Sequence, residues 1–487
     1  MNPSSYASLP ERFFARVQPT HVAAPGLIKL NQALASDLNL DISGLDAPAL
    51  AKLFSGNVLP LGTVPIAMAY AGHQFGHFVA QLGDGRAILI GEMRDRAGLL
   101  RDIQLKGCGR TPYSRSGDGR AALGPVLREY LISEAMHALG IPTTRSLAAV
   151  TTGESVQRET TQPGAILTRV AASHVRVGTF EYFAARGDAA GTKILADYVI
   201  DRHYPLCAHD KSPYLALLKQ VVSRQAALVA RWMNVGFIHG VMNTDNMAVS
   251  GETIDFGPCA FMDTFDPATV FSSIDERGRY GFANQPNAAL WNLARLAETL
   301  LPLIDADTQR AVGVATEAIE TFETLFKDCW LDGMRRKLGL STSEQGDRQL
   351  AEDLLQAMQR NQADFTLSFR ALCAAARDPQ GDAMARGHFL NAGDYDEWAQ
   401  RWRARMSREA TTLNLRAESM QQANPAYIPR NHRVEQVIVA AVERGDFAPF
   451  EELSQVLAAP NVARAAFARY ANPPQPGERV LQTFSGT

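Results

Sequence analysis

Three side chains in the middle of the chain, Asp245, Asn246 and Asp255, have the types and the spacing for metal-assisted chemistry on phosphate groups. Asp245 and Asn246 lie in a short polar stretch after His239, and Asp255 begins an Asp-Phe-Gly triplet. Carboxylate and amide oxygens are the ligands that Mg²⁺ prefers, with phosphate oxygens and waters completing its shell. A further carboxylate at such a site could accept the proton of an attacking hydroxyl. The alternative interpretation is a polar loop followed by the end of a strand, and a lone Asp-Phe-Gly does not decide between the two.

A lysine and a glutamate nearer the N-terminus could hold the phosphates. Lys106 ends a predicted strand, Asp102 to Lys106, and Glu129 lies on a helix predicted to begin at Pro125 and to end before Gly140. Kinase-like enzymes place a strand lysine on the phosphates and hold it with a glutamate of the following helix. Each residue alone could be a solvated charge, but the order of the elements favours the pair.

Two glycine-rich segments carry an arginine each: LGDGR at residues 82–86 and SGDGR at residues 116–120. Glycines allow the backbone to approach a phosphate closely, and an arginine fork fits phosphate oxygens bidentately. Arg169 and Arg176 flank a stretch without helical pattern and could add further contacts. Neither segment is a Walker loop, and an ordinary Gly-Asp-Gly turn is the alternative for either one alone.

The elements that must position these groups change in character after Gly178. We predict an α+β, protein-kinase-like bilobal fold. Residues 1–178 form a sheet-bearing, nucleotide-binding lobe, and residues 179–487 form a helical lobe with the catalytic and metal-binding loops and an extended C-terminal tail. Further strands are predicted at Gln81–Leu82, Arg86–Ile90, Ser146–Val150, Ser155–Glu159 and Gly164–Val170. Helices are predicted at Thr179–Ala185, Thr192–His203, Tyr214–Gly236 and over most of Asn287–Ala376.

Composition excludes several classes of protein. The 487 residues contain 48 Lys and Arg against 51 Asp and Glu, so the net charge of −3 gives no general attraction to nucleic acid or to an anionic membrane. The five cysteines form no C-x-x-C pair, which argues against a disulfide framework and a structural zinc site. No long apolar run or secretion signal is present. We therefore expect a cytoplasmic protein with no nucleic-acid or membrane partner, and a monomer by default.

Several long strings make the chain recognisable. They are YAGHQFGHF (70–78), QLGDGRA (81–87), QLKGCGRTPYSRSGDGRAALGPVLREYL (104–131), HGVMNTDNM (239–247), IDFGP (254–258), RYGFANQP (279–286) and NPAYIPRNH (424–432). With them the chain resembles the SelO (selenoprotein O, YdiU) family of kinase-like protein adenylyltransferases over essentially its whole length. Such long and unusual strings are far more specific than an Asp-Phe-Gly triplet.

The resemblance implies a kinase-like fold in which ATP lies flipped relative to ordinary kinases. The implied reaction transfers AMP from ATP to Ser, Thr or Tyr hydroxyls of protein substrates and releases pyrophosphate. Mg²⁺ is the implied cofactor, with Mn²⁺ left open. By position, Asp245 is the implied proton acceptor, and Asn246 and Asp255 are the implied metal ligands. The implied nucleotide site comprises Gly83, Gly85, Arg86, Lys106, Asp118, Gly119, Arg169, Arg176 and Asp255, with Glu129 paired to Lys106.

The kinase pattern itself is broken. In the kinase loop H-R-D-x-x-x-x-N the catalytic aspartate follows His by two positions, and Val241 occupies that position here. A strict kinase interpretation therefore predicts an inactive protein, whereas Asp245 could replace the missing base. Two alternatives remain open: a nucleotide-binding scaffold without catalysis, and a conventional phosphotransferase.

One feature of the family is missing. Many members carry a cysteine or selenocysteine near the C-terminus that can bridge to a cysteine after the Asp-Phe-Gly, but here Phe484 and Phe271 stand about where these would be expected. Redox control by such a bridge is therefore not expected. Our hypothesis is that the two phenylalanines make an apolar contact instead.

Overall fold

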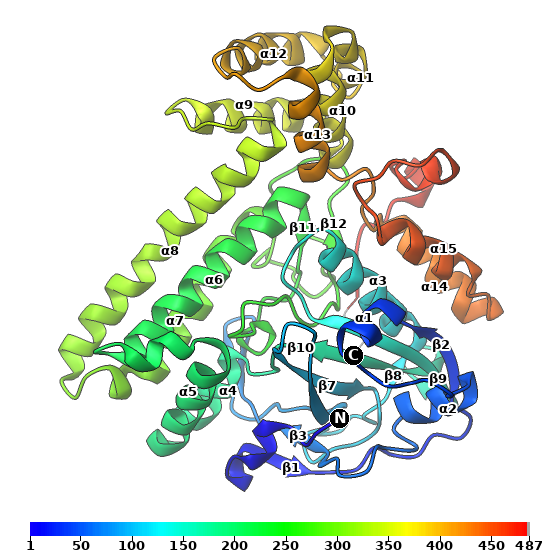
Figure 1. Ribbon diagram of the computed structural model, residues 1–487, viewed down its shortest axis with the longest axis vertical. Helices are drawn as coiled ribbons and strands as arrows, with labels where there is room; N and C mark the ends of the chain where they lie inside the picture. The colour runs from blue at the N-terminus through cyan, green and yellow to red at the C-terminus, as the bar shows by residue number, and fades with distance from the viewer. Residues whose placement is uncertain (485–487) are drawn as a thin grey trace.

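The N-terminal third of the chain builds one large antiparallel sheet. The computed structural model describes residues 1–484 (Figure 1). Along the sheet the strands run β1 (Phe14–Arg16), β3 (Ile66–Met68), β6 (Ala87–Arg94), β7 (Leu100–Lys106), β10 (Thr161–Ala171), β9 (Arg145–Gln157) and β2 (Gly26–Leu30), and β8 (Ala121–Ala122) pairs with β10. Lys106 ends β7 in the centre of this sheet, between Ala87 of β6 and Leu167 of β10.

Alternation of side chains gives the sheet two buried faces. Val150 and Ile166 pack with helices α1 (Gln32–Asp37) and α2 (Ala47–Phe54), whereas their chain neighbours Ala149 and Leu167 pack with helix α3 (Leu123–Ala138). Successive residues of a strand point to opposite faces, so apolar runs at these positions bury both. The helix predicted from Pro125 is confirmed as α3, which begins two residues earlier.

Helix α3 is covered on its outer side by the C-terminal part of the chain. Helices α14 (Asn431–Arg444) and α15 (Ala448–Leu457) lie along it, as Figure 1 shows. Val434 and Leu453 share one apolar cluster with Leu127 and Leu131 of α3. An ion pair between Arg128 and Glu435 adds a polar contact at this packing surface.

Most of the remainder of the described chain is helical. The helices are α4 (Val177–Ala184), α5 (Ala189–His203), α6 (Pro213–Val235), α7 (Gln285–Ile304), α8 (Thr308–Lys337), α9 (Asp347–Arg360), α10 (Phe365–Arg377), α11 (Asp382–Arg386), α12 (Ala392–Met406) and α13 (Leu413–Ala423). In Figure 1 the long α8 leads away from the sheet to the cluster formed by α9–α13. Helix α6 ends at Gly236, whose φ of 75° is the left-handed cap that glycine adopts most easily. Immediately after it, β11 (Phe237–Ile238) pairs with β12 (Ala260–Phe261), and the loop between these short strands carries Asp245 and Asp255.

The predicted α+β class is confirmed, and two of the predicted strands need correction. Gln81–Leu82 is not a strand: the backbone N–H groups of Leu82 and Asp84 bond the carbonyls of Tyr70 and Met68 in an irregular segment. Ser146–Val150 and Ser155–Glu159 belong largely to a single long strand, β9. The division into lobes at residue 178 stays a prediction.

The C-terminal tail lies against the segment that follows the Asp-Phe-Gly triplet. The backbone N–H of Thr483 donates to the carbonyl of Phe271, and the N–H of Ser273 donates to the carbonyl of Thr483. Phe271 is buried, but Phe484 is 64% exposed, and within residues 1–484 no ring contact joins the two. The Thr483 hydroxyl also donates to the Pro258 carbonyl at 2.5 Å, so both the backbone and the side chain of Thr483 attach the tail. The last three residues lie outside the described part of the chain.

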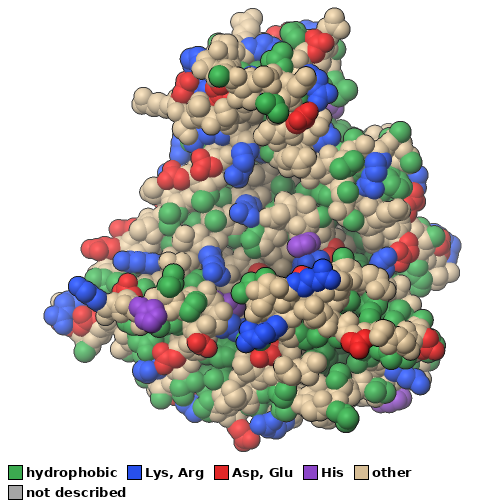
Figure 2. All heavy atoms as spheres, in the orientation of Figure 1, with side chains coloured by type: hydrophobic (Ala, Val, Ile, Leu, Met, Phe, Trp, Pro, Cys, Tyr) green, Lys and Arg blue, Asp and Glu red, His purple; other side chains and the backbone are tan. Residues whose placement is uncertain are grey.

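The visible surface carries charges of both signs, and the described cysteines form no disulfide. Figure 2 shows basic and acidic side chains interspersed over the visible face, in keeping with the small net charge. The cysteines are unpaired, and four of the five are buried. No helix within residues 1–484 combines the length and the apolar character needed to cross a membrane. The cytoplasmic location stays a prediction.

Candidate active site

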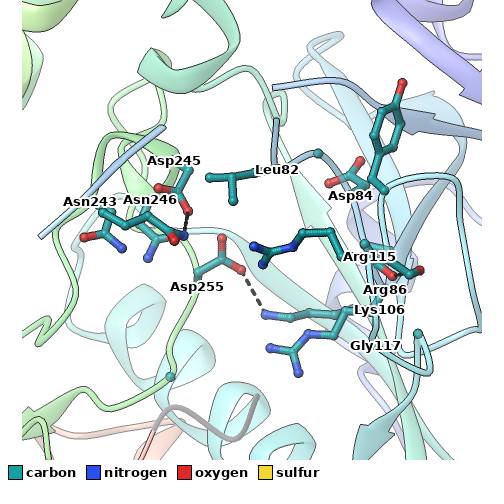
Figure 3. A pocket seen from close by; sticks show the side chains of 18 of the residues that line it. Leu82, Asp84, Arg86, Lys106, Arg115, Gly117, Asn243, Asp245, Asn246 and Asp255 are labelled. Carbon is teal, nitrogen blue, oxygen red and sulfur yellow. Dashed lines mark hydrogen bonds and ion pairs between the residues drawn. The ribbon is translucent and has the colours of Figure 1, made fainter. Parts of the chain in front are cut away.

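A cavity of about 770 Å³ lies where the sheet faces the loop between β11 and β12. Eleven of the predicted site residues line it: Gly83, Gly85, Arg86, Lys106, Asp118, Gly119, Arg169, Arg176, Asp245, Asn246 and Asp255. The twelfth, Glu129, is in contact with Lys106. Figure 3 shows Asp245 and Asn246 on one side of the cavity and Lys106 and Arg86 on the other, with Asp255 between them.

Lys106 joins the sheet to both helix α3 and the Asp-Phe-Gly triplet. Its Nζ donates to Glu129 Oε2 at 2.7 Å and to Asp255 Oδ1 at 2.9 Å. All three side chains are largely removed from solvent, so each ion pair offsets the cost of burying the others. The predicted Lys106–Glu129 pair is therefore present.

Asp255 is held by three cations. Besides Lys106, Arg169 donates to Oδ1 at 2.6 Å and Arg176 donates to Oδ2 at 2.7 Å. Burial raises the pKa of the Asp255 carboxyl, but these positive charges outweigh it and hold the pKa well below its usual range. The backbone φ of Asp255 is +63°, a left-handed conformation that is uncommon outside glycine. The cation cluster thus keeps an anionic carboxylate in a conformation that the backbone alone disfavours.

Asn246 is oriented by the loop that carries it. Its side-chain Nδ2 donates to the Val241 carbonyl at 3.0 Å, which leaves the amide oxygen available to a ligand in the cavity. Asn246 Oδ1 and the Asp255 carboxylate are hard oxygen donors and fit Mg²⁺ or Mn²⁺. Within residues 1–484 no group of three or more His, Cys, Asp and Glu side chains could hold a metal ion. The remaining ligands would have to be phosphate oxygens and waters.

The Asp245 carboxylate has fewer hydrogen-bond partners than that of Asp255. Its side chain is buried, and burial raises its pKa to about 6, although the charge of Arg176 acts in the opposite direction. Gln74 Nε2 donates to Oδ2 at 3.3 Å, and Oδ1 has no hydrogen-bond partner. A buried acceptor without a partner is costly, so it marks a position where a ligand donor is expected.

A hairpin from the sheet-bearing part of the chain covers the loop around Asp245. Strands β4 (Gly72–Gln74) and β5 (His77–Val79) are joined by Phe75 and Gly76, whose φ angles of 50° and 84° are those of a type I′ turn. The N–H of His73 donates to Thr244 Oγ1 at 2.6 Å, and the N–H of Phe75 donates to Asn243 Oδ1 at 2.9 Å. The hairpin therefore fixes the loop on which the candidate base lies.

Buried groups on helix α4 and near α7 complete this support. Glu181 bonds both the His73 ring and the Thr244 hydroxyl, and the Tyr280 hydroxyl donates to Asn243 Oδ1 at 2.8 Å. Gly72 leaves no room for a side chain, since a Cβ there would lie 2.5 Å from Asp245 Oδ1. The sequence interpretation assigned no role to these residues, although the strings YAGHQFGHF, HGVMNTDNM and RYGFANQP contain all of them except Glu181.

The two glycine-rich segments form the wall opposite Asp245. Gly83 and Gly119 have φ angles of 75° and 70°, which only glycine adopts without strain. Asp118 accepts from Arg158 Nη1 at 2.8 Å and from the N–H of Arg120 at 2.8 Å. Arg158 also lines the cavity, yet no local pattern distinguished it in the sequence.

Asp84 was also missed, although it lies within LGDGR. It is buried, and its Oδ2 accepts from the N–H of Met68 at 3.0 Å and from Gln104 Nε2 at 3.3 Å. Gln104 Oε1 in turn accepts from Arg169 Nη2 at 2.6 Å. Asp84 and Gln104 thus hold Arg169 beside the cavity.

Together the fold and the site define a class. A lysine from the central sheet paired to a glutamate of the following helix, facing an Asp-Phe-Gly aspartate, is the arrangement of a kinase-like α+β protein. The family profile described as "Protein adenylyltransferase SelO" matches residues 2–458, and this chain belongs to that family.

Curated relatives agree with the family profile. The chain is 61% identical to "Protein nucleotidyltransferase YdiU" of Rhodopseudomonas palustris (strain HaA2), over 99% of this chain and 98% of that protein. It is 60% identical to the protein of the same name in Rhizobium meliloti (strain 1021), over 99% of each chain.

Proposed function

We propose that this protein transfers AMP from ATP to Ser, Thr or Tyr hydroxyls of other proteins and releases pyrophosphate. Family membership and the names of its relatives support nucleotidyl transfer to protein. The observation that carries the proposal for this chain is the position of Asp245. Its carboxyl group lies beside Asn246 among the residues that line the cavity, and its buried Oδ1 has no hydrogen-bond partner.

The cations of the sheet lobe supply the binding energy for a triphosphate. In our proposal Lys106, Arg169 and Arg176 exchange part of their contact with Asp255 for the β- and γ-phosphate oxygens, with Arg86 beside them. Charge-assisted bonds from buried guanidinium groups to phosphate are strong and directional. Holding the outer phosphates among these groups leaves the α-phosphate toward Asp245.

The reaction then needs one proton transfer. The acceptor hydroxyl donates its hydrogen bond to the Asp245 carboxylate, its oxygen attacks the α-phosphorus, and the bond from that phosphorus to the oxygen bridging to the β-phosphorus breaks. Asp245 accepts the proton and pyrophosphate leaves with the electron pair. A general base in this position contributes about 10²- to 10⁴-fold to the rate. Mg²⁺ or Mn²⁺ bound by Asn246 and Asp255 would neutralise charge that develops on the phosphate oxygens.

ATP labelled on one phosphate tests the proposal. With α-labelled ATP and divalent metal, we expect label in the acceptor protein and a mass increase of one adenylate. With γ-labelled ATP, we expect label only in released pyrophosphate. Protein label from the γ position alone would instead assign a phosphotransferase.

The scaffold alternative is favoured by Val241, which occupies the position of the kinase base. Wild-type protein that binds ATP but labels no acceptor with either metal would support it. The Asp245→Asn variant is the matched control for every labelling reaction, since it removes the base and alters little volume.

A further inference from the structure

Near Asp245 lies an arginine, Arg279, that forms no ion pair with any carboxylate of residues 1–484. We propose that Arg279 binds an acidic side chain next to the hydroxyl that is modified, so that the preferred acceptors are Ser, Thr or Tyr residues with a neighbouring Asp or Glu. This inference rests on the proposed function, because it names the protein segment that the same site would accept.

Arg279 is held between aromatic rings. Its guanidinium carbon lies 4.8 Å from the ring centroid of Trp291 and 5.8 Å from that of Tyr280. Stacking on aromatic faces orients a guanidinium without neutralising it. The neighbouring Tyr280 hydroxyl is neutral, because burial raises its pKa to about 12, and it donates to Asn243 Oδ1.

No carboxylate pairs with this group. Among residues 1–484, no ion pair involves Arg279, and its buried Nε has no hydrogen-bond partner. The Asp275 carboxylate in the same turn accepts from the backbone N–H groups of Arg279 and Tyr280, both at 2.8 Å. Within the described part of the chain, Arg279 therefore keeps an oriented positive charge without a carboxylate partner.

A second arginine on the same tryptophan provides the contrast. Arg295 also lies 4.8 Å from the Trp291 centroid, but its Nη2 pairs with Glu298 at 2.8 Å. Both guanidinium groups lie over one ring, and among residues 1–484 only Arg295 of the two has a carboxylate partner. The difference points to a ligand that supplies one.

Arg279 is also close to the candidate base. A Cβ on Gly76 would lie 3.4 Å from its guanidinium, and Gly76 is in the turn of the hairpin whose Gln74 bonds Asp245. Ile274, 53% exposed, lines the cavity together with Gln74. A peptide whose hydroxyl enters past Ile274 and Gln74 would carry a neighbouring side chain to Arg279.

Matched peptides test the inference. Three peptides, each with a single Ser, Thr or Tyr, are prepared with Asp or with Asn beside the hydroxyl, and transfer from α-labelled ATP is measured. For the wild type we expect kcat/KM to be about fivefold or more higher for the Asp peptide than for the Asn peptide. The difference should appear in KM, because one partly buried charged contact strengthens peptide binding. Arg279→Gln should abolish the preference, Arg279→Lys should keep part of it, and Arg295→Gln should keep all of it.

Other readouts separate this inference from the proposed function. The same peptides, carrying a fluorescent label, are titrated with protein in the absence of ATP, and binding is measured by anisotropy. Affinity should be higher for the Asp peptides than for the Asn peptides, and Arg279→Gln should lose this difference. Thermal denaturation of the two Gln variants reports any shared loss of packing on Trp291. Transfer to both peptide versions at equal rates would overturn the role of Arg279 and leave AMP transfer intact. Absence of any transfer, with equal binding of both versions, would overturn both.

Discussion

Gln74 Nε2 lies 3.3 Å from Asp245 Oδ2, so an amide from the β4–β5 hairpin is the side-chain hydrogen-bond donor to the candidate base. This bond lowers the pKa of Asp245 against the larger effect of burial, which raises it to about 6. The hairpin thereby tunes a group that lies 171 residues away in the chain.

Replacing Gln74 should therefore change the pH dependence of transfer. In Gln74→Ala the lost hydrogen bond raises the pKa of Asp245 further, and in Gln74→Glu a second carboxylate raises it more. We expect the acidic limb of the kcat/KM profile to move to higher pH in both variants, with the larger shift in Gln74→Glu. An unchanged limb in both would show that Gln74 does not act on the base.

The activity of the wild-type enzyme should also depend on the ionisation of Asp245. Only the ionised Asp245 carboxylate can accept a proton, so kcat/KM should rise as pH increases through about 6 and level off above it. Asp245→Asn should lower kcat by about 10²-fold or more at pH 8. ATP binding by the variant, measured by calorimetry, should be retained. A loss of binding equal to the loss of rate would contradict the assignment.

Metal binding should depend on nucleotide. Without a triphosphate, the Asp255 oxygens are shared among Lys106, Arg169 and Arg176, and these charges repel a cation. We expect Mn²⁺ affinity, measured by electron paramagnetic resonance, to rise about tenfold or more when a non-hydrolysable ATP analogue is added. Asp255→Asn is the control and should lose this gain. Equal Mn²⁺ affinity with and without nucleotide would mean that the cations do not compete.

A methyl group at Gly72 should disturb the site more than the fold. In Gly72→Ala the added carbon would lie 2.5 Å from Asp245 Oδ1 and must displace that carboxylate. We expect activity to fall about tenfold or more, because small displacements of reacting groups are costly. Gly313→Ala on the exposed side of α8 meets no atom within 4 Å and should leave activity unchanged and stability slightly higher. Steady-state assays and thermal melts of both variants make the comparison.

Lys337 should make stability depend on pH. It is 3% exposed, lies 4.1 Å from the Phe369 ring centroid, and burial lowers its pKa from 10.5 to about 7. Between these values the unfolded chain binds more protons than the folded one, so this residue makes stability increase as pH rises from about 7 toward 10.5.

Lys337→Met removes the buried amine and keeps the volume. We expect the variant to raise Tm by about 3 °C at or below pH 7, with a gain that shrinks toward pH 10. Thermal melts at pH 6, 7.5 and 9.5 measure this trend. A gain that grows with pH would show that the amine is charged and stabilised where it lies.

The sequence predicted the parts of the site that depend on local order. A strand ending in Lys106 and a helix carrying Glu129 follow each other in the chain, so their pairing could be anticipated. The His73–Thr244 and Gln74–Asp245 contacts could not, because each joins residues 171 positions apart and neither segment shows what its partner is. The prediction of a strand at Gln81–Leu82 was wrong, because Leu82 is buried in an irregular segment and not in the sheet.

The packing of helices α14 and α15 on helix α3 also has a consequence for folding during synthesis. The helix that carries Glu129 buries its outer side under residues 431–457, so a polypeptide still emerging from the ribosome has no cover for those apolar side chains until synthesis is almost finished. The helix that pairs with Lys106 therefore gains its full apolar packing only when the last tenth of the chain has been made.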